Sequence, residues 1–210
     1  MWGAKNGKAR KLLFLMATLI IPVAIYLFLR GFGENHYVVP VLFEQGIPKD
    51  TADCPFGQSF HMVNISGLPK NLPGQDNLNF DGKLSVIDID IRSTNRIGYT
   101  GYSLNRVTDV FENENSVQFI LIGTHPGIVN EKQSQENKRF IYVYGNLEQI
   151  TAFARCQLVL LDFPENIDQK NRRLVLIDRR GRIRGYYRLN DFSEMDRMIL
   201  EMKIILAEEF

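Results

Sequence analysis

An uncharged apolar run near the N-terminus restricts the architecture of this chain more than any other feature. The run extends from Leu12 to Leu29, follows a cluster of lysines and arginines, and is closed by Arg30. As an α-helix with a rise of about 1.5 Å per residue, it approaches the roughly 30 Å hydrocarbon core of a bilayer. We therefore predict one transmembrane helix over residues 12–30, with the bilayer as its partner.

The charges around this run predict its orientation. Four basic residues precede it, Lys5, Lys8, Arg10 and Lys11, and the long remainder of the chain follows it. The positive-inside bias makes residues 1–11 a cytoplasmic basic tail of an inner (cytoplasmic) membrane protein, with the chain beyond Gly31 in the periplasm. A cleaved signal peptide is the alternative, but the run exceeds a usual signal apolar region and no small-x-small site follows it.

The composition allows one domain of common size after this helix. The chain has 210 residues, 45% of them hydrophobic, and a formal net charge of +1. This charge implies no strong attraction to nucleic acid, so we expect no nucleic-acid partner. The two cysteines, Cys54 and Cys156, are too few and too far apart for a zinc site or a disulfide framework.

Periodicity predicts an α/β domain that follows a connector. Residues 31–57 have the composition of a juxtamembrane connector, in which Pro40 restricts Tyr37–Phe43 to a short edge strand. Residues 58–210 hold a βαβ unit, a further strand and helix, an antiparallel hairpin and a closing helix. This order predicts a thioredoxin-like sandwich, a central mixed sheet flanked by helices. The expected strands are residues 58–64, 84–91, 116–122, 138–144, 173–178 and 182–187, and the expected helices are residues 103–111, 147–155 and the segment after Asp191.

The last helix has the clearest local signature. Asp191-x-x-Glu194 resembles a capping box, in which a carboxylate accepts from the free N–H groups of the first turn. Met195, Met198 and Met202 follow at three- and four-residue intervals. Thioethers are soft copper ligands, but this helical spacing favours core packing.

Several motifs point to a known family. Phe140–Gly145 looks like a family strand end, Leu147–Ala154 like the helix after it, and Leu176–Tyr187 contains a Leu-Ile-Asp-x-x-Gly-x-Ile hairpin. These segments resemble the Sco/SenC family of membrane-anchored, thioredoxin-like copper chaperones associated with the terminal oxidase. The likeness covers roughly residues 58–208 and the N-terminal anchor, and its hairpin is shared with peroxiredoxin-like proteins.

The resemblance also shows what has been lost. In the family, the loop after the first core strand reads roughly Thr-Ser-Cys-Pro-x-x-x-Cys-Pro, whereas the loop Arg92–Tyr99 contains no Cys or His. Aligned on Ser93, the two family cysteines fall on Thr94 and Gly98. The family histidine, eight residues before the hairpin Asp, falls on Lys170. None of these side chains is a copper(I) ligand, so the resemblance implies a degenerate member without cofactor or loop thiol chemistry.

Other candidate site residues have ordinary interpretations beside the functional ones. His36 and His61 fit surface or packing roles, and His125 keeps a weak functional role because it ends a core strand near the loop. Asp88 and Asp90 share one face of a core strand and could bind a cation or act in acid–base chemistry. We favour a partly wet face, or bonds to Arg92, Arg96 or a covering segment.

Two further features concern covalent and surface contacts. Cys54 and Cys156 could form one bridge in an oxidising exterior, although they form no Cys-x-x-Cys motif. Basic residues near the hairpin could contact an acidic partner or anionic headgroups, or simply protect a solvated edge. The candidate interaction surface comprises Arg96, Ile97, Tyr99, Arg172, Arg173, Arg180 and Arg182.

These observations together favour a role without catalysis. We expect an assembly factor or accessory subunit of a respiratory membrane complex, cytochrome c oxidase first, with the oxidase or another Sco-like protein as partner. One alternative is an assembly protein of another envelope complex. The other is a thiol oxidoreductase that uses Cys54 and Cys156.

Overall fold

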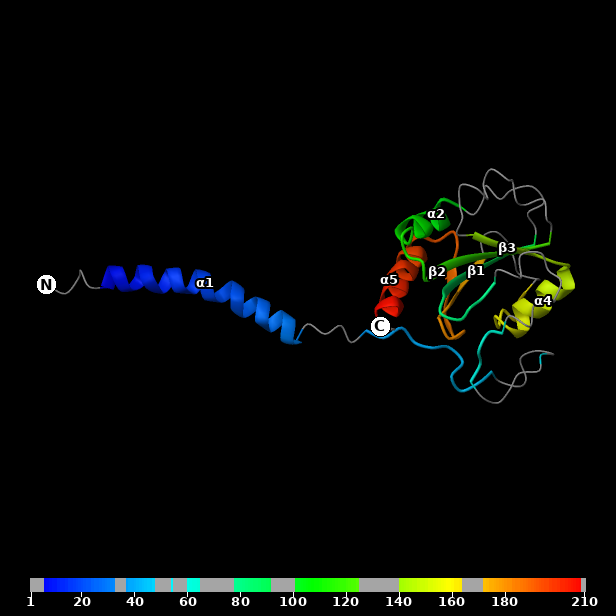
Figure 1. The fold of residues 1–210 in the computed structure, drawn as a ribbon, viewed down its shortest axis with the longest axis horizontal. Helices are drawn as coiled ribbons and strands as arrows, with labels where there is room; N and C mark the ends of the chain where they lie inside the picture. The colour runs from blue at the N-terminus through cyan, green and yellow to red at the C-terminus, as the bar shows by residue number, and fades with distance from the viewer. Residues whose placement is uncertain are drawn as a thin grey trace. The chain divides into compact units, whose positions relative to one another are not determined.

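The computed structural model describes residues 6–32, 37–47, 54, 60–64, 78–91, 101–124, 140–163 and 172–208. The chain separates into two compact units, Met1–Tyr37 and Val38–Phe210. The folded unit therefore includes part of the segment expected to be a connector. Figure 1 shows the long helix of the first unit and the sheet and helices of the second.

The N-terminal unit is built on one helix, α1 (Asn6–Phe32), which contains the predicted apolar run and Pro22. Its 27 residues correspond to about 40 Å of helix. Residues Ala9–Gly31 are long and apolar enough to cross a membrane. By length and composition, this helix suits a membrane anchor or a signal sequence.

The second unit is organised around a mixed five-stranded sheet in the order β3-β2-β1-β4-β5. The strands are β1 (Leu84–Asp90), β2 (Val117–Gly123), β3 (Phe140–Tyr144), β4 (Arg173–Ile177) and β5 (Ile183–Arg188). Strands β1, β2 and β3 are parallel, and β4 is antiparallel to both β1 and β5. The prediction of a mixed sheet is confirmed.

Helices cover both faces of this sheet (Figure 1). On one face α4 (Leu147–Cys156) packs Ile150 and Phe153 against Ile87 and Ile120. On the other face lie α2 (Gly101–Val110) and α5 (Phe192–Glu208), whose buried residues meet Val86. The α/β sandwich expected from the sequence is confirmed. Alternating residues of each strand point to opposite faces of the sheet and pack into two separate apolar layers.

Helix α5 confirms the interpretation of its methionines. Met195, Met198 and Met202 are all fully buried in the layer between α5 and the sheet. At the start of the helix, a carboxylate oxygen of Asp191 accepts hydrogen bonds from the backbone and hydroxyl of Ser193. These bonds lower the pKa of Asp191, and Arg188 contributes further.

A buried polar pair lies between α5 and β5. The Tyr187 hydroxyl donates a hydrogen bond to the carboxylate of Glu201, and Arg197 lies 4.7 Å from the centre of the tyrosine ring. Gly185 makes room for this ring, because a Cβ there would lie 2.5 Å from the Tyr187 hydroxyl. The pKa of Tyr187 is raised, mainly by burial and then by its hydrogen bond to Glu201, so the phenol keeps its proton and donates it to the hydrogen bond.

Two expected strands are absent. The described residues 37–47 and 60–64 form no strand. Pro40 lacks a backbone donor, and each of the two segments is held by separate contacts instead of a ladder. Leu42 donates to the carbonyl of Ile183 at 2.8 Å, and Val63 donates to the carbonyl of Gly181 at 2.8 Å.

Candidate functional site

The expected functional loop, Arg92–Tyr99, lies entirely outside the described residues, and with it Thr94, Gly98, Arg96, Ile97 and Tyr99. Lys170, His36 and His125, elsewhere in the chain, also lie outside them. The roles predicted for these residues therefore stay predictions. The end of β1, which leads into this loop, and the start of the neighbouring strand β4 are described, and these two places contain a cluster of charged side chains.

Three buried or partly buried side chains form an ionic triad where β1 ends. Asp88, only 1% exposed, accepts hydrogen bonds from two nitrogens of Arg172, with an Nε–Oδ1 distance of 2.6 Å. Asp90 accepts from a third nitrogen, Nη1, at 2.7 Å. A guanidinium presents its donors in a fork that matches carboxylate geometry, so Arg172 satisfies both aspartates at once.

Strand topology places Arg172 between the two carboxylates. Asp88 pairs in register with Leu174 of the antiparallel neighbour β4, and Arg172 comes just before that strand. Its side chain therefore reaches the face of β1 that carries Asp88 and Asp90. The expected partners Arg92 and Arg96 lie outside the described residues and stay predictions. In the described part of the chain, Arg172, distant in sequence but adjacent in the sheet, supplies a cation.

The charged groups of the triad are paired with one another. Burial works to lower the pKa of Arg172, but the charges and hydrogen bonds of Asp88 and Asp90 raise it overall. The guanidinium thus stays protonated and would repel a metal cation. Arg172, which we expected in a contact surface, is 8% exposed, and its guanidinium is bonded to the two aspartates.

The second constellation is a disulfide near the end of α4. Cys54 and Cys156 are bridged, with their Cα atoms 5.3 Å apart, within the usual range for a disulfide. The bridge links positions separated by 102 residues. It joins α4 to a segment that we call the strap, defined as the described residues 37–47, 54 and 60–64.

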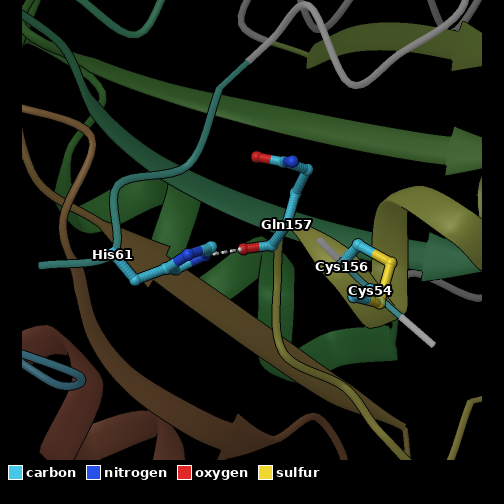
Figure 2. Close-up of a disulfide and its surroundings, with 4 residues drawn as sticks. All are labelled: Cys54, His61, Cys156 and Gln157. Atoms are coloured by element: carbon cyan, nitrogen blue, oxygen red, sulfur yellow. Dashed lines mark hydrogen bonds between the residues drawn. A yellow bond between two sulfur atoms is a disulfide. The ribbon is translucent and has the colours of Figure 1, made fainter. Parts of the chain in front are cut away.

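Side chains next to the bridge attach the strap to the end of α4. Figure 2 shows His61 pointing at the backbone of Gln157, where its Nε2 lies 2.7 Å from the carbonyl oxygen. The side-chain oxygen of Gln157 accepts from the backbone of Asn64 at 2.8 Å. His61 also meets the ring of Phe43 edge-on. His61 therefore has the packing role expected for it.

The N-terminal end of the strap is held by α5 and β5. The carbonyl of Val39 accepts from Arg184 at 2.6 Å, and its backbone nitrogen donates to Glu208 at 3.3 Å. Arg184 and Glu208 also pair directly at 3.0 Å. Val39 is fully buried, so the strap is a true part of the domain.

The basic hairpin is mostly committed to internal contacts. Buried Asp178 accepts from Arg182 at 2.6 Å and from Arg184 at 3.2 Å. Its other carboxylate oxygen accepts from the backbone nitrogens of Arg180 and Arg182, which shapes the turn. Arg173 pairs with Asp162 at the surface, while the side chain of Arg180 is exposed.

Sequence reasoning missed the roles of Asp178 and Arg184. An aspartate that starts a turn and accepts from the backbone N–H groups that follow is a known turn signal. The sequence Asp178-Arg-Arg-Gly181 carried that signal, and Gly181 adopts the left-handed φ of +79°. The contact between Arg184 and Val39 had no local signal, because it joins residues 145 positions apart.

Comparison with known proteins supports the fold. No protein-family model and no curated protein sequence matches the chain. Among solved structures, it is similar to BsSco, a member of the Sco family of cytochrome c oxidase assembly proteins. The two align with a TM-score of 0.51 and 15% identity over 69% of this chain and 93% of BsSco. The domain shares the thioredoxin-like fold of BsSco.

Two other Sco structures align less closely. A SCO1/SenC family lipoprotein from Bacillus anthracis gives a TM-score of 0.47 and 21% identity over 60% of this chain and 83% of its own. Arabidopsis thaliana ScoI, solved with copper bound, gives 0.41 and 16% over 60% of this chain and 87% of its own.

The described residues do not fit the copper(I) site that the sequence resemblance would imply. Copper(I) favours thiolate and thioether donors, and both cysteines of the chain are joined in one bridge. Within the described part of the chain, no group of three His, Cys, Asp or Glu residues could hold a metal ion. The match of Thr94, Gly98 and Lys170 to the family ligands stays a prediction, because all three lie outside the described residues.

Proposed function

We propose that this protein is a membrane-anchored, Sco-like protein that works through its surface and not through copper or thiol chemistry. It would act as an assembly factor or accessory subunit of a respiratory membrane complex, and cytochrome c oxidase is the partner that we favour. The observation that carries the proposal is the Cys54–Cys156 bridge. It occupies both cysteines of the chain, in a fold otherwise similar to an oxidase assembly protein.

The proposed arrangement has the N-terminus in the cytoplasm and the folded unit in the periplasm. Residues 1–11 form the basic tail, residues 12–30 span the inner membrane, and the folded domain follows from the strap onward. The positive charges before the span support this orientation. A disulfide in the domain is also typical of an oxidising compartment.

Copurification tests the partner. The tagged full chain should bring oxidase subunits with it from gently solubilised membranes, and Cys54→Ser/Cys156→Ser should complement a deletion strain. Recovery of a different envelope complex in constant proportion would replace the oxidase with that complex. Failure of the double variant to complement, while it still folds, would favour the thiol oxidoreductase.

A copper titration tests the loss of the metal site. The full chain in detergent should bind no stoichiometric copper(I). The variant Thr94→Cys/Gly98→Cys/Lys170→His serves as the positive control, because it restores the family donor set. Stoichiometric binding by the natural sequence, abolished by changing Cys54, Cys156 or His125, would overturn the proposal.

The proposed contact residues lie in two places: Arg96, Ile97 and Tyr99 belong to the loop after β1, whereas the exposed Arg180 and the partly buried Arg182 belong to the hairpin turn, beside the start of β1. Arg173, at the start of β4, is exposed as well. Arg180 is the sharpest probe, because its side chain is exposed while its backbone is fixed by Asp178. Arg180→Glu should weaken copurification with an acidic partner. Lys203→Glu makes an equal change of charge at an exposed position of α5, and it should leave copurification unchanged.

The thiol oxidoreductase is the second candidate, favoured by a partly exposed disulfide. One feature weighs against it. Cys156 is the last residue of α4, where the negative end of the helix dipole disfavours a thiolate. Reactive cysteines of this kind are favoured at the opposite end of a helix.

A further inference from the structure

Backbone strain gathers around the disulfide. Of the described residues other than glycine, two adopt a left-handed φ: Phe43, at +61°, and Val159, at +54°. This region is disfavoured for any residue with a Cβ, and a β-branched residue such as Val159 is a true outlier there. Phe43 belongs to the strap, and Val159 follows Cys156 by three residues, so the bridge joins two strained segments.

The contacts of these two segments keep the strain in place. The carbonyl of Phe43 accepts from the backbone of His61 at 3.3 Å, and His61 in turn contacts the carbonyl of Gln157. Beside Val159, the carbonyl of Leu158 accepts from the Tyr186 hydroxyl at 2.7 Å. Strained backbone persists only where its surroundings over-determine it, and here the surroundings include a covalent bond that can be broken.

In its described part, the strap is joined to the sheet by separate backbone bonds instead of a ladder. Leu42 donates to Ile183 and Val63 to Gly181. The central strands differ, because Ile87 and Ile120 are fully buried within a continuous parallel register. A segment with sparse backbone bonding opens more readily than a central strand.

We propose that Cys54–Cys156 is a redox-controlled clamp, and that its reduction releases the strap while the sheet stays folded. The reductant is a dithiol. One of its thiolates attacks a sulfur of the bridge to form a mixed disulfide, and its second thiol resolves this intermediate. The bridge gains two electrons and two protons and becomes two thiols, while the dithiol becomes a disulfide. Both cysteines are partly exposed, which gives the reductant access.

Release follows because the bridge keeps the strap at a high effective concentration beside α4. Without that tether, the hydrogen bonds and apolar contacts of the strap must hold two strained segments alone. The clamp uses the same bridge as the proposed function, but it changes the conformation of the domain and turns over no substrate, whatever complex the protein joins.

Hydrogen exchange on the full chain in detergent tests the clamp. Reduction with dithiothreitol should speed exchange at the amides of Leu42 and Val63 by at least about tenfold, the scale of a lost covalent tether. The amides of Ile87 and Ile120 should keep their rates. Cys54→Ser/Cys156→Ser should exchange rapidly at the strap with or without the reductant.

Two results would overturn the clamp. Unchanged strap exchange after mass spectrometry shows a reduced bridge would mean that the strap is held without it. Equal acceleration in the strap and in the central strands would mean that reduction loosens the whole domain.

The variant Val159→Asn tests the part played by strain. Asn tolerates the left-handed region better than a β-branched residue, so it should slow strap exchange in the reduced protein. Exchange as fast as in the reduced natural sequence would refute a contribution from strain at this position.

Discussion

Removal of Arg172 should destabilise this domain more than removal of any exposed arginine. In Arg172→Ala, the carboxylate of Asp88 stays in a site that is 1% exposed and loses both of its hydrogen-bond donors. Breaking a buried pair by removing one partner costs about 3–5 kcal/mol, because the remaining charge is uncompensated. The neighbouring residue provides a matched control, since Arg173 and its partner Asp162 have side chains 45% and 44% exposed.

The expected difference is large enough for urea denaturation of the full chain in detergent, followed by near-ultraviolet circular dichroism of the buried tyrosines. With a slope of about 2 kcal/mol per molar urea, Arg172→Ala should lower the midpoint by about 2 M. Arg173→Ala should change the free energy of unfolding by at most about 1 kcal/mol, as is usual for a surface pair.

The apolar double variant Arg172→Met/Asp88→Leu separates two contributions to the free energy of unfolding: the stabilisation by the ion pair itself, and the cost of leaving the Asp88 carboxylate buried without a partner. It should recover most of the stability lost in Arg172→Ala, because apolar residues of similar volume often replace buried ion pairs without loss. The reasoning is refuted if Arg172→Ala and Arg173→Ala have the same midpoint, or if the double variant is less stable than Arg172→Ala.

Three further predictions concern α5 and its neighbours. Met198→Ala should cost about 2–5 kcal/mol of unfolding free energy, whereas Leu200→Ala, at a position 58% exposed, should cost far less; chemical denaturation measures both. Gly185→Ala should destabilise the domain by about 1–3 kcal/mol by overpacking against Tyr187, and equal stability would show that the ring can move aside. The lowered pKa of Asp191 gives stability that is complete above the unfolded pKa of about 3.9 and is lost as pH falls through the folded pKa; Asp191→Asn should remove this part of the acid dependence of the melting temperature.

The sequence predicts the sheet and the helices because their patterns are local. The β-branched run in β1, the alternation into two layers and the methionine spacing of α5 each indicate one structure, and the structure has them. The expected strands at 37–43 and 58–64 failed for a different reason. Their apolar residues do pack on the domain, as buried Val39 and Val63 show, but packing alone does not make a ladder, and Pro40 withholds a donor.

Pairings across the chain were harder to predict than elements. Asp88 and Asp90 were recognised as needing a partner, yet nothing local distinguishes Arg172 from Arg92 or Arg96. The choice depends on strand order, since only the antiparallel position of β4 beside β1 brings Arg172 to this face. The same limit applied to Cys54 and Cys156, which the sequence left open and the fold brings within bonding distance.

The strap and its disulfide also determine how the chain would respond to mechanical tension. A pull along the chain from α1 would first reach the contacts of Val39 and then the bond between Leu42 and Ile183. These are separate bonds that can break one after another. At Cys54 the tension would meet a covalent link and pass directly to Cys156, bypassing β1, α2, β2, β3 and α4. The oxidised domain would therefore first lengthen by the part of the strap before Cys54, with β1, β2 and β3 shielded from the force.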